Sequence, residues 1–331
     1  MLLLCFGLHI VTLALLAVRH SQQLSTAQSH THRRPAIPSG LIKIIGTLAF
    51  VLTLLLPYQY THLDGLSQCQ IRVACFFYGC KMLDLALCKS ETPPRIIKVE
   101  RTTPQKLESL FDHVKYMWLL LAEMRYGSFD IAVHQKGRSS ETEQDRQIST
   151  SFAALVFLGA VNYLYPLAEL KCICLLLILQ VAFEGLHAVV HPNCRRPLFY
   201  RPFSASSMGD FWATHWHACA APFLYSLGYK PGRRLTGQWL GVLATFNISG
   251  LWHGWSAAGL VDDQYYATVL GSQVWALFML FGVICLAERI VWRDKQGGMI
   301  QRIIVWVLPV LAAGQCLRTL ERYTTIPWLR I

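Results

Sequence analysis

The chain has 331 residues, of which 53% are hydrophobic and only 15% are charged. A soluble domain carries about a quarter charged residues, and the mean hydropathy here is +0.36. The apolar residues are gathered in runs, so the composition excludes an ordinary soluble protein and favours a multi-span membrane protein. The net charge is +11, but the basic residues lie in short segments between apolar runs. That pattern argues against a nucleic-acid partner and fits cytosolic loops beside a lipid bilayer.

The first half of the chain contains three expected spans, at residues 1–18, 40–58 and 71–88. The third is weaker because Lys81 and Asp84 interrupt it. Arg19 follows the first span closely, which predicts a lumenal N-terminus. Residues 89–150 are polar apart from a short apolar patch at 116–122. We therefore expect a cytosolic region there, with one helix lying in the membrane interface.

The second half contains five more expected spans, at residues 151–168, 172–190, 237–255, 268–288 and 303–319. A tight connection at Glu169 and Lys171 joins the first two. Residues 218–228 are apolar but too short to cross, so they predict a re-entrant segment. Lys230, Arg233 and Arg234 then predict a cytosolic turn. The fold class is an all-α integral membrane protein of about eight transmembrane helices, within about seven to nine, and residues 1–331 form a single domain.

Residues 202–255 hold the densest set of reactive side chains. Asp210 and His217 are seven residues apart, so on an α-helix they share one face, with Thr214 between them. Phe211, Trp212 and Trp216 cover the other sides of that helix. The arrangement is compatible with a polar face toward a cavity. It is equally compatible with an interfacial helix whose tryptophans lie in the aromatic belt.

His253 lies within an apolar run, four residues after Ser249 and on the same helical face. A single histidine in an apolar helix is often only a packing residue. Its chemistry favours a function, because a neutral imidazole can accept a proton from an alcohol near neutral pH. An ionisable group at membrane depth is also costly to retain without a role.

A second histidine set offers an alternative. Glu184, His187 and His191 share one helical face, as in part of a membrane di-iron hydroxylase site. Such enzymes need several histidine boxes, and this chain has one HxxxH pair and no HxxHH, so we expect no metal ligands. A transporter whose intramembrane histidine relays protons is a further alternative.

Two segments carry a family resemblance. Ser207-Met208-Gly209-Asp210-Phe211-Trp212-Ala213-Thr214-His215-Trp216-His217 resembles the S-L-x-D-F-W-G-R-R-W-H signature of wax-synthase-like proteins, which belong to the membrane-bound O-acyltransferase superfamily. Ser249-Gly250-Leu251-Trp252-His253-Gly254 resembles the second signature of that family. The two occur in the expected order and at the expected distance, and together they cover roughly the C-terminal half of the chain.

The resemblance implies a helical membrane enzyme that uses acyl-CoA as co-substrate and needs no other cofactor. An acyl group would pass to a lipophilic alcohol in a buried reaction chamber. His253 would act as general base on the hydroxyl, and Asp210 and His217 would assist as catalytic residues near the thioester. Trp212, Trp216, Asn247 and Ser249 would contribute to substrate binding.

One departure from the family pattern concerns the phosphates of coenzyme A. Ala213-Thr214-His215 stands where the signature has Gly-Arg-Arg, which removes two guanidinium groups. We expect Arg201, Arg233 and Arg234 to supply such contacts. By analogy with fungal secondary-metabolite enzymes, the substrates would be an acetyl donor and a terpenoid or meroterpenoid alcohol, in the endoplasmic reticulum membrane. Wax-ester synthesis from a long-chain acyl-CoA and a fatty alcohol is the alternative.

Overall fold

Helices make up most of the structure, a computed structural model that describes residues 1–29, 37–98, 101–104, 107–124, 126–131, 141–190, 198–201, 204–216, 219–292 and 298–324. The chain divides into two compact units. The first comprises Met1–Leu63, Ile71–Val133 and Ala220–Leu227, and the second comprises Asp64–Gln70, His134–Cys219 and Gly228–Ile331. The fold is helical, as expected; a single domain over residues 1–331 stays a prediction.

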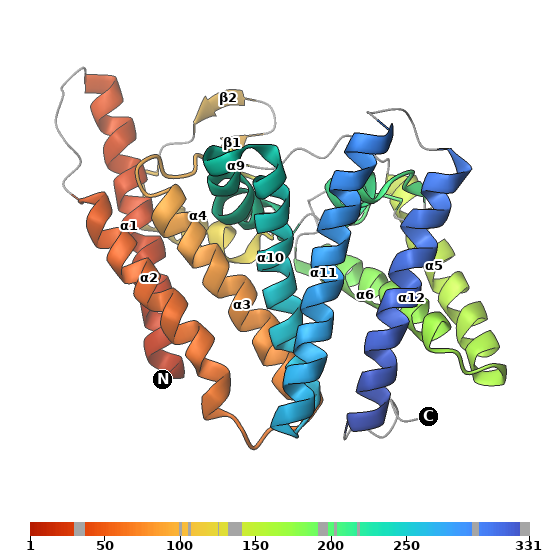
Figure 1. The fold of residues 1–331 in the computed structure, drawn as a ribbon. Coiled ribbons are helices and arrows are strands. Elements are labelled where there is room, and N and C mark those ends of the chain that lie inside the picture. Colours follow the sequence, from red (N-terminus) through yellow and green to blue (C-terminus); the bar gives the residue numbers. More distant parts are fainter. Residues whose placement is uncertain are drawn as a thin grey trace. The chain divides into compact units, whose positions relative to one another are not determined.

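The first unit is built on long helices and one short hairpin. Its elements are α1 (Leu2–Ser29), α2 (Ser39–Leu55), a 3-10 turn (Leu56–Gln59), most of α3 (Gly65–Cys88), the antiparallel strands β1 (Ile97–Lys98) and β2 (Arg101–Pro104), α4 (Leu110–Ala122) and α8 (Ala221–Phe223). Helices α1 and α2 pack side by side (Figure 1). The first turns of α3 belong to the second unit.

Helix α2 has its apolar residues on the outside. Its exposed side carries large aliphatic residues at helical spacing: Leu41, Ile44, Leu48, Val51 and Leu55. Its buried side carries Ile42, Gly46, Ala49 and Thr53. A Cβ on Gly46 would lie 2.3 Å from that of Ala86 in α3. Small residues between helices and large aliphatic ones outside are typical of helices that face lipid, so this helix supports an integral membrane protein.

Helix α4 begins at a capping box, in which the Ser109 hydroxyl accepts from the backbone N–H of Asp112 and the Asp112 carboxylate accepts from that of Ser109. The bonds that the carboxylate accepts from the Ser109 N–H and from the Ser109 hydroxyl lower the pKa of the Asp112 carboxyl. Tyr116 and Leu120 face the core of the first unit. The expected helix is therefore present but starts before the apolar patch at 116–122, because a polar cap fixes its start. Its location in the interface stays a prediction.

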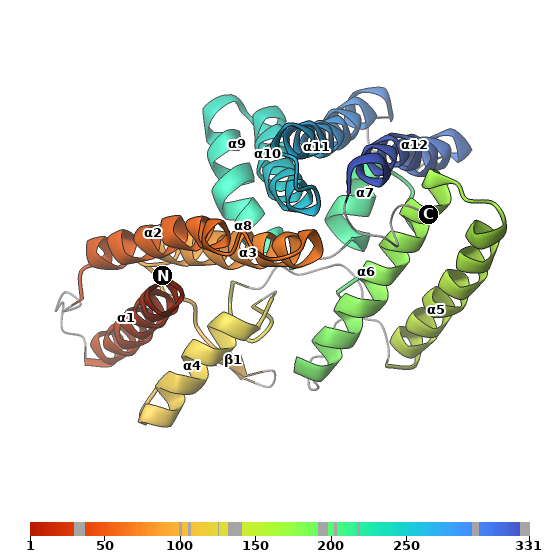
Figure 2. The same cartoon turned by 90° about the horizontal axis from the view of Figure 1, so that it is seen from below.

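The second unit holds α5 (Glu141–Leu164), α6 (Ala168–Val190), α7 (Met208–Asp210), α9 (Lys230–Thr236), α10 (Gln238–Ala257), α11 (Gln264–Trp292) and α12 (Met299–Tyr323). Helix α10 packs along α11, whereas α6 lies between α5 and α12 (Figure 2). Helix α12 also contacts α11.

A described helix corresponds to each of the eight expected spans. Among the residues that the structure describes, five segments are long and apolar enough to cross a membrane: Leu2–Leu24, Ser39–Gln59, Ala168–His187, Gln264–Trp292 and Met299–Tyr323. Helices α3, α5 and α10 fall short of this criterion. Charged or polar side chains interrupt α3 and α10, while the apolar part of α5 covers only Ser149–Leu164. The total of about eight therefore stays a prediction.

Two local expectations were wrong. The connection between α5 and α6 lies at residues 165–167 and not at Glu169 and Lys171, which belong to the first turn of α6. Pro166 accounts for the shift, because proline has no N–H to continue a helix. Lys230, Arg233 and Arg234 form helix α9 and not a turn. Pro231 fits a first helical turn, and Gly237, with a φ of 87°, ends the helix.

Polar contacts align the helix ends of the second unit. Arg318 near the end of α12 donates to Glu169 at 2.6 Å, and Lys171 donates to Glu321 at 2.5 Å. The Thr324 hydroxyl donates to the carbonyl of Leu260, just after α10, at 3.0 Å. The start of α6 and the ends of α10 and α12 therefore lie together.

Candidate active site

The first signature begins as a capped helix and ends in a wider turn. Ser207 has extended backbone angles, and its hydroxyl accepts from the N–H of Asp210 at 2.9 Å. The chain then passes into a π-helical turn, Phe211–His215, which Trp216 closes by donating its N–H to the Phe211 carbonyl at 2.7 Å. The prediction of an α-helix that places Asp210 and His217 on one face was wrong, because the helix ends before residue 217. His217 itself lies outside the described residues.

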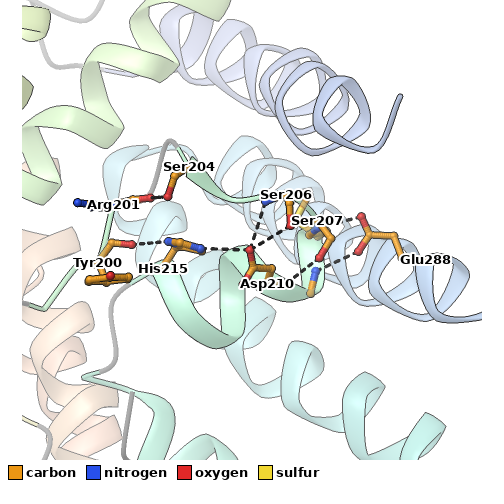
Figure 3. A network of polar contacts seen from close by, with 10 residues as sticks. Tyr200, Arg201, Ser204, Ser206, Ser207, Asp210, His215 and Glu288 are labelled. Carbon is orange, nitrogen blue, oxygen red and sulfur yellow. Dashed lines mark hydrogen bonds and ion pairs between the residues drawn. The ribbon is translucent and has the colours of Figure 1, made fainter. Parts of the chain in front are cut away.

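The partner of Asp210 in the structure is His215 (Figure 3). Asp210 Oδ2 lies 3.1 Å from His215 Nε2 and also accepts from the Ser206 N–H and hydroxyl. The other ring nitrogen, Nδ1, contacts the backbone carbonyl oxygen of Tyr200. Both neighbours of the ring are acceptors, so an imidazolium that donates from both nitrogens satisfies this geometry.

His215 is a residue that the sequence reasoning missed as a site member. In the sequence, this position shows only that an arginine of the related signature is absent. The π-helical turn brings residues five apart into contact, as the bond from the Trp216 N–H to the Phe211 carbonyl does. An i, i+5 pair has no place in an α-helical periodicity, so the spacing of Asp210 and His215 gave no signal.

Two buried glutamates hold this segment from neighbouring helices. Glu288 of α11 accepts from the N–H of Met208 at 2.8 Å and from that of Gly209 at 3.0 Å. Glu184 of α6 accepts from the N–H of Phe199 at 2.7 Å. Neither glutamate is visible as a partner in the sequence. Glu288 lies about 80 positions downstream of the groups it binds.

An aromatic cluster connects the two signatures. The Trp212 ring lies 5.7 Å from Phe246, 5.6 Å from Phe278 and 5.5 Å from Phe281, measured between ring centroids. Phe211 is stacked on Trp216 at 5.2 Å. Trp212 and Trp216, both expected at the substrate, therefore belong to an apolar layer against α10 and α11.

His253 stands in the last turns of α10. Its Nδ1 lies 2.8 Å from the backbone carbonyl oxygen of Ser249, and its ring is stacked on Phe278 at 4.2 Å. Because a carbonyl oxygen only accepts, Nδ1 carries the hydrogen and the lone pair of a neutral ring is on Nε2. Within the described residues Nε2 has no hydrogen-bond partner. The geometry therefore leaves the basic nitrogen available.

The residues around His253 fix helix α10 against α11. A Cβ on Gly254 would lie 2.4 Å from the backbone oxygen of Gly271, so the two helices meet backbone to backbone. Asn247, expected to bind substrate, accepts at 3.0 Å from the indole N–H of Trp275. Ser249 is buried, and its backbone carbonyl binds His253. Both residues support the helix pair, and substrate contact by either stays a prediction.

Of the three arginines expected to bind phosphate, Arg201 lies beside the polar contacts of Asp210 and His215, and its carbonyl accepts from the Ser204 hydroxyl (Figure 3). Arg233 and Arg234 are exposed in the last turn of α9, and within the described part of the chain they make no ion pair. The Arg201 guanidinium lies 6.0 Å from the ring of Tyr200. Its backbone has a φ of 45°, a left-handed conformation that is strained for a non-glycine residue. Their role toward coenzyme A stays a prediction.

No three His, Cys, Asp or Glu side chains among the described residues are grouped closely enough to hold a metal ion. Of the alternative metal set, Glu184 and His187 are buried in α6, and His191 lies outside the described residues. No contact joins Asp210 to His253 within the described chain. The link between the two signatures is the aromatic path through Trp212 and Phe278.

An apolar groove of about 310 Å³ lies between α5, α6 and α12. Its lining is Ala154, Leu158, Ile173, Leu176, Leu177, Trp306 and Val310. Trp306 also contacts Phe211 edge to face, at 5.7 Å between ring centroids. The groove therefore adjoins the aromatic layer of the first signature.

Comparisons with known proteins agree with the two signatures. Residues 195–280 match the model of the membrane bound O-acyl transferase family. The long-chain-alcohol O-fatty-acyltransferase of Simmondsia chinensis is 23% identical over 185 residues, which cover 50% of this chain and 51% of that protein. Probable long-chain-alcohol O-fatty-acyltransferase 7 of Arabidopsis thaliana is 29% identical over 135 residues, 38% of each chain.

The chain thus spans about half the length of the Simmondsia protein and less of the Arabidopsis protein. No solved structure matches it. The matches support a place in the membrane-bound O-acyltransferase superfamily, among its wax-synthase-like members.

Proposed function

We propose that the protein is a membrane O-acyltransferase that transfers an acyl group from acyl-CoA to the hydroxyl of a lipophilic alcohol. The proposal rests on the hydrogen bonding of His253, which determines which ring nitrogen is basic. Its Nδ1 is bound to the Ser249 carbonyl, so Nε2 is the basic atom, and the residue lies within the segment that matches the family. An imidazole of this kind is suited to take a proton from an alcohol.

The proposed reaction needs no acyl-enzyme. His253 Nε2 takes the proton of the acceptor hydroxyl while the oxygen attacks the thioester carbonyl carbon. The new C–O bond forms and the C–S bond breaks. The sulfur leaves as thiolate and receives the proton held by His253, so the imidazole returns to its neutral form. The aromatic layer around Trp212 would exclude water, which otherwise competes with the alcohol as acceptor.

Asp210 and His217 remain the proposed assisting residues at the thioester. Asp210 uses Oδ2 for His215 and Ser206, whereas Oδ1 has no hydrogen bond to a described residue. Its side chain is 33% exposed, so Oδ1 would be available to a donor group of the substrate. Arg201, Arg233 and Arg234 are proposed contacts to the phosphates of coenzyme A.

Two substrate pairs fit this chemistry. The sequence resemblance favours acetyl-CoA with a terpenoid or meroterpenoid alcohol. The relatives named for long-chain alcohols and the apolar groove at Trp306 favour a long-chain acyl-CoA with a fatty alcohol, because the groove has the wholly apolar lining that an acyl chain requires.

We propose a buried chamber between the helices of the second unit as the site, and the endoplasmic reticulum as the membrane.

The test uses the full chain in microsomes or nanodiscs. Radiolabelled acetyl-CoA and palmitoyl-CoA are each offered with a terpenoid alcohol and with hexadecanol, and esters are separated by chromatography. Product from one pair identifies the donor and acceptor class. An absence of ester from every pair, with protein that is inserted and monodisperse, would contradict the proposed function.

A further inference from the structure

Glu288 is a buried carboxylate near the end of a membrane span. Glu288 is only 6% exposed and lies one turn before α11 ends at Trp292. Carboxylates in such positions are costly and are retained for a purpose. Both of its oxygens are used, one by the N–H of Met208 and the other by the N–H of Gly209.

These two N–H groups are the first of a helix and have no carbonyl partner within it. Helix α7 is only three residues long before the π-helical turn begins, so its own hydrogen bonds do little to fix its orientation. Glu288 supplies the acceptor for each of these two N–H groups. Helix α11 therefore fixes the orientation of helix α7, with which the first signature begins.

A second carboxylate acts on the other side of the same segment. Glu184 of α6 binds the N–H of Phe199, and Phe199 meets Trp216 edge to face at 4.9 Å. The carbonyl of Tyr200, the next residue, accepts from Nδ1 of His215. The segment is thus held from α11 near its start and from α6 near its end.

We propose that Glu288 is a positioning residue for acyl transfer, which fixes the segment Met208–His215 so that Asp210 and Trp212 meet the acyl-CoA. The inference rests on the proposed function. Glu288 touches only main-chain groups of this segment, so it acts through Asp210 and Trp212 and does not contact the substrate. The same geometry explains why a glutamate, with two equivalent acceptors, stands at this position.

Glu288→Gln is the sharpest variant because glutamine has the same shape. It keeps one acceptor oxygen but turns an NH2 group toward a second N–H, so one bond is lost and two donors face each other. Glu288→Asp keeps both acceptors on a shorter side chain and should restore part of the function. Glu169→Gln is the matched control, since Glu169 pairs with Arg318 at the opposite end of the second unit.

Two readouts test the proposal. In steady-state kinetics, Glu288→Gln should raise the KM for acyl-CoA and lower kcat/KM for it roughly tenfold to a hundredfold, with the KM for the alcohol unchanged. In hydrogen exchange, peptides covering residues 204–216 should exchange faster while the rest of the second unit keeps its protection. Glu169→Gln should change neither.

The outcomes are distinguishable from failure of the proposed function. If the wild type forms no ester, the proposed function fails, and exchange in residues 204–216 alone decides whether Glu288 holds the segment. If the wild type is active and Glu288→Gln only lowers the amount of folded enzyme, with both KM values unchanged, the positioning role is overturned. Unchanged exchange in residues 204–216 would overturn it as well. Should Glu288→Gln fail to insert, Ser207→Ala removes the cap of the same helix and should move both readouts in the same direction.

Discussion

The imidazole of His253 lies against the phenyl ring of Phe278, with 4.2 Å between ring centroids and 24° between ring planes. Phe278 also meets Trp212 at 5.6 Å. One residue of α11 thus supports the proposed base on one side and the first signature on the other. The ring of His253 is fixed by this stack and by the bond from Nδ1 to Ser249.

Replacing His253 with alanine should abolish most ester formation, because no other group is proposed to take the proton of the hydroxyl. Loss of a general base lowers the rate about 10²- to 10⁴-fold. The measurement is the initial rate of ester formation at equal amounts of inserted protein. His62→Ala, an exposed histidine in the first unit, is the control and should keep wild-type activity. A His253→Ala variant with full activity would remove the proposed base.

Replacing Phe278 with leucine should have a smaller effect. Leucine fills most of the space but offers no flat face for the His253 ring, so the ring loses its fixed orientation. An aromatic pair contributes about 0.5–1.5 kcal/mol beyond burial, which corresponds to a severalfold fall in kcat. Phe6→Leu, on the exposed side of α1, is the control. Equal rates for both variants would mean that the stack has no part in the reaction.

Replacing His215 tests the cation inferred between Asp210 and Tyr200. His215→Ala leaves the Asp210 carboxylate without the ring N–H of His215 and should lower kcat/KM roughly tenfold to a hundredfold, the range for hydrogen bonds to charged groups. His215→Arg keeps a permanent cation at the position where the related signature has arginine, and should retain more activity than His215→Ala. If alanine and arginine behave alike, the charge at this position is not used.

Gly254→Ala should destabilise the second unit. The added Cβ would lie 2.4 Å from the backbone oxygen of Gly271, and a backbone contact cannot relax as a flexible side chain does. Overpacking of this kind costs about 1–3 kcal/mol and would separate α10 from α11. Gly185→Ala is the matched control, because nothing lies within 4 Å of its added Cβ. Thermal unfolding in detergent compares the two, and an equal Tm would contradict the close approach of the helices.

Lys81→Met should loosen helix α4 within the first unit. The buried ammonium of Lys81 donates to the carbonyl of Leu121 at 2.9 Å and to that of Glu123 at 2.6 Å, so it caps the end of α4. Losing charged hydrogen bonds to these carbonyls costs about 1.5–3 kcal/mol. Lys115→Met, on the exposed side of the same helix, should have little effect. The measurement is the rate of limited proteolysis in the part of the chain that follows residue 104 and contains α4. Equal cleavage rates in the two variants would count against the cap.

Much of the fold follows from local features of the sequence. Apolar runs gave the positions of the long helices, since a run of that length has no other stable form in a bilayer. His253 was found because an ionisable group in an apolar run is conspicuous. Helix starts were less accurate where a polar cap, such as Ser109, begins a helix before its apolar residues.

The remainder depends on contacts between distant parts of the chain. The π-helical turn that pairs Asp210 with His215 changes the periodicity on which the helix prediction relied. Glu288 lies in a span that shows nothing unusual except one acidic residue, and its partners are main-chain groups with no signature in any side chain. In the sequence, Gly254 is only part of a motif. The physical reason for a glycine there is the close approach of the Gly271 backbone, which is visible only in three dimensions.

The bonds that hold the first signature go largely to the main chain, at Phe199, Tyr200, Met208 and Gly209. Every residue type except proline offers the same N–H, and every residue offers the same carbonyl. These main-chain bonds do not depend on the side chains at the four positions, so a substitution there that keeps the packing of Phe199 on Trp216 and of Met208 on Trp212 leaves the anchorage in place. Replacing Glu184, His215 or Glu288 removes the bonds themselves.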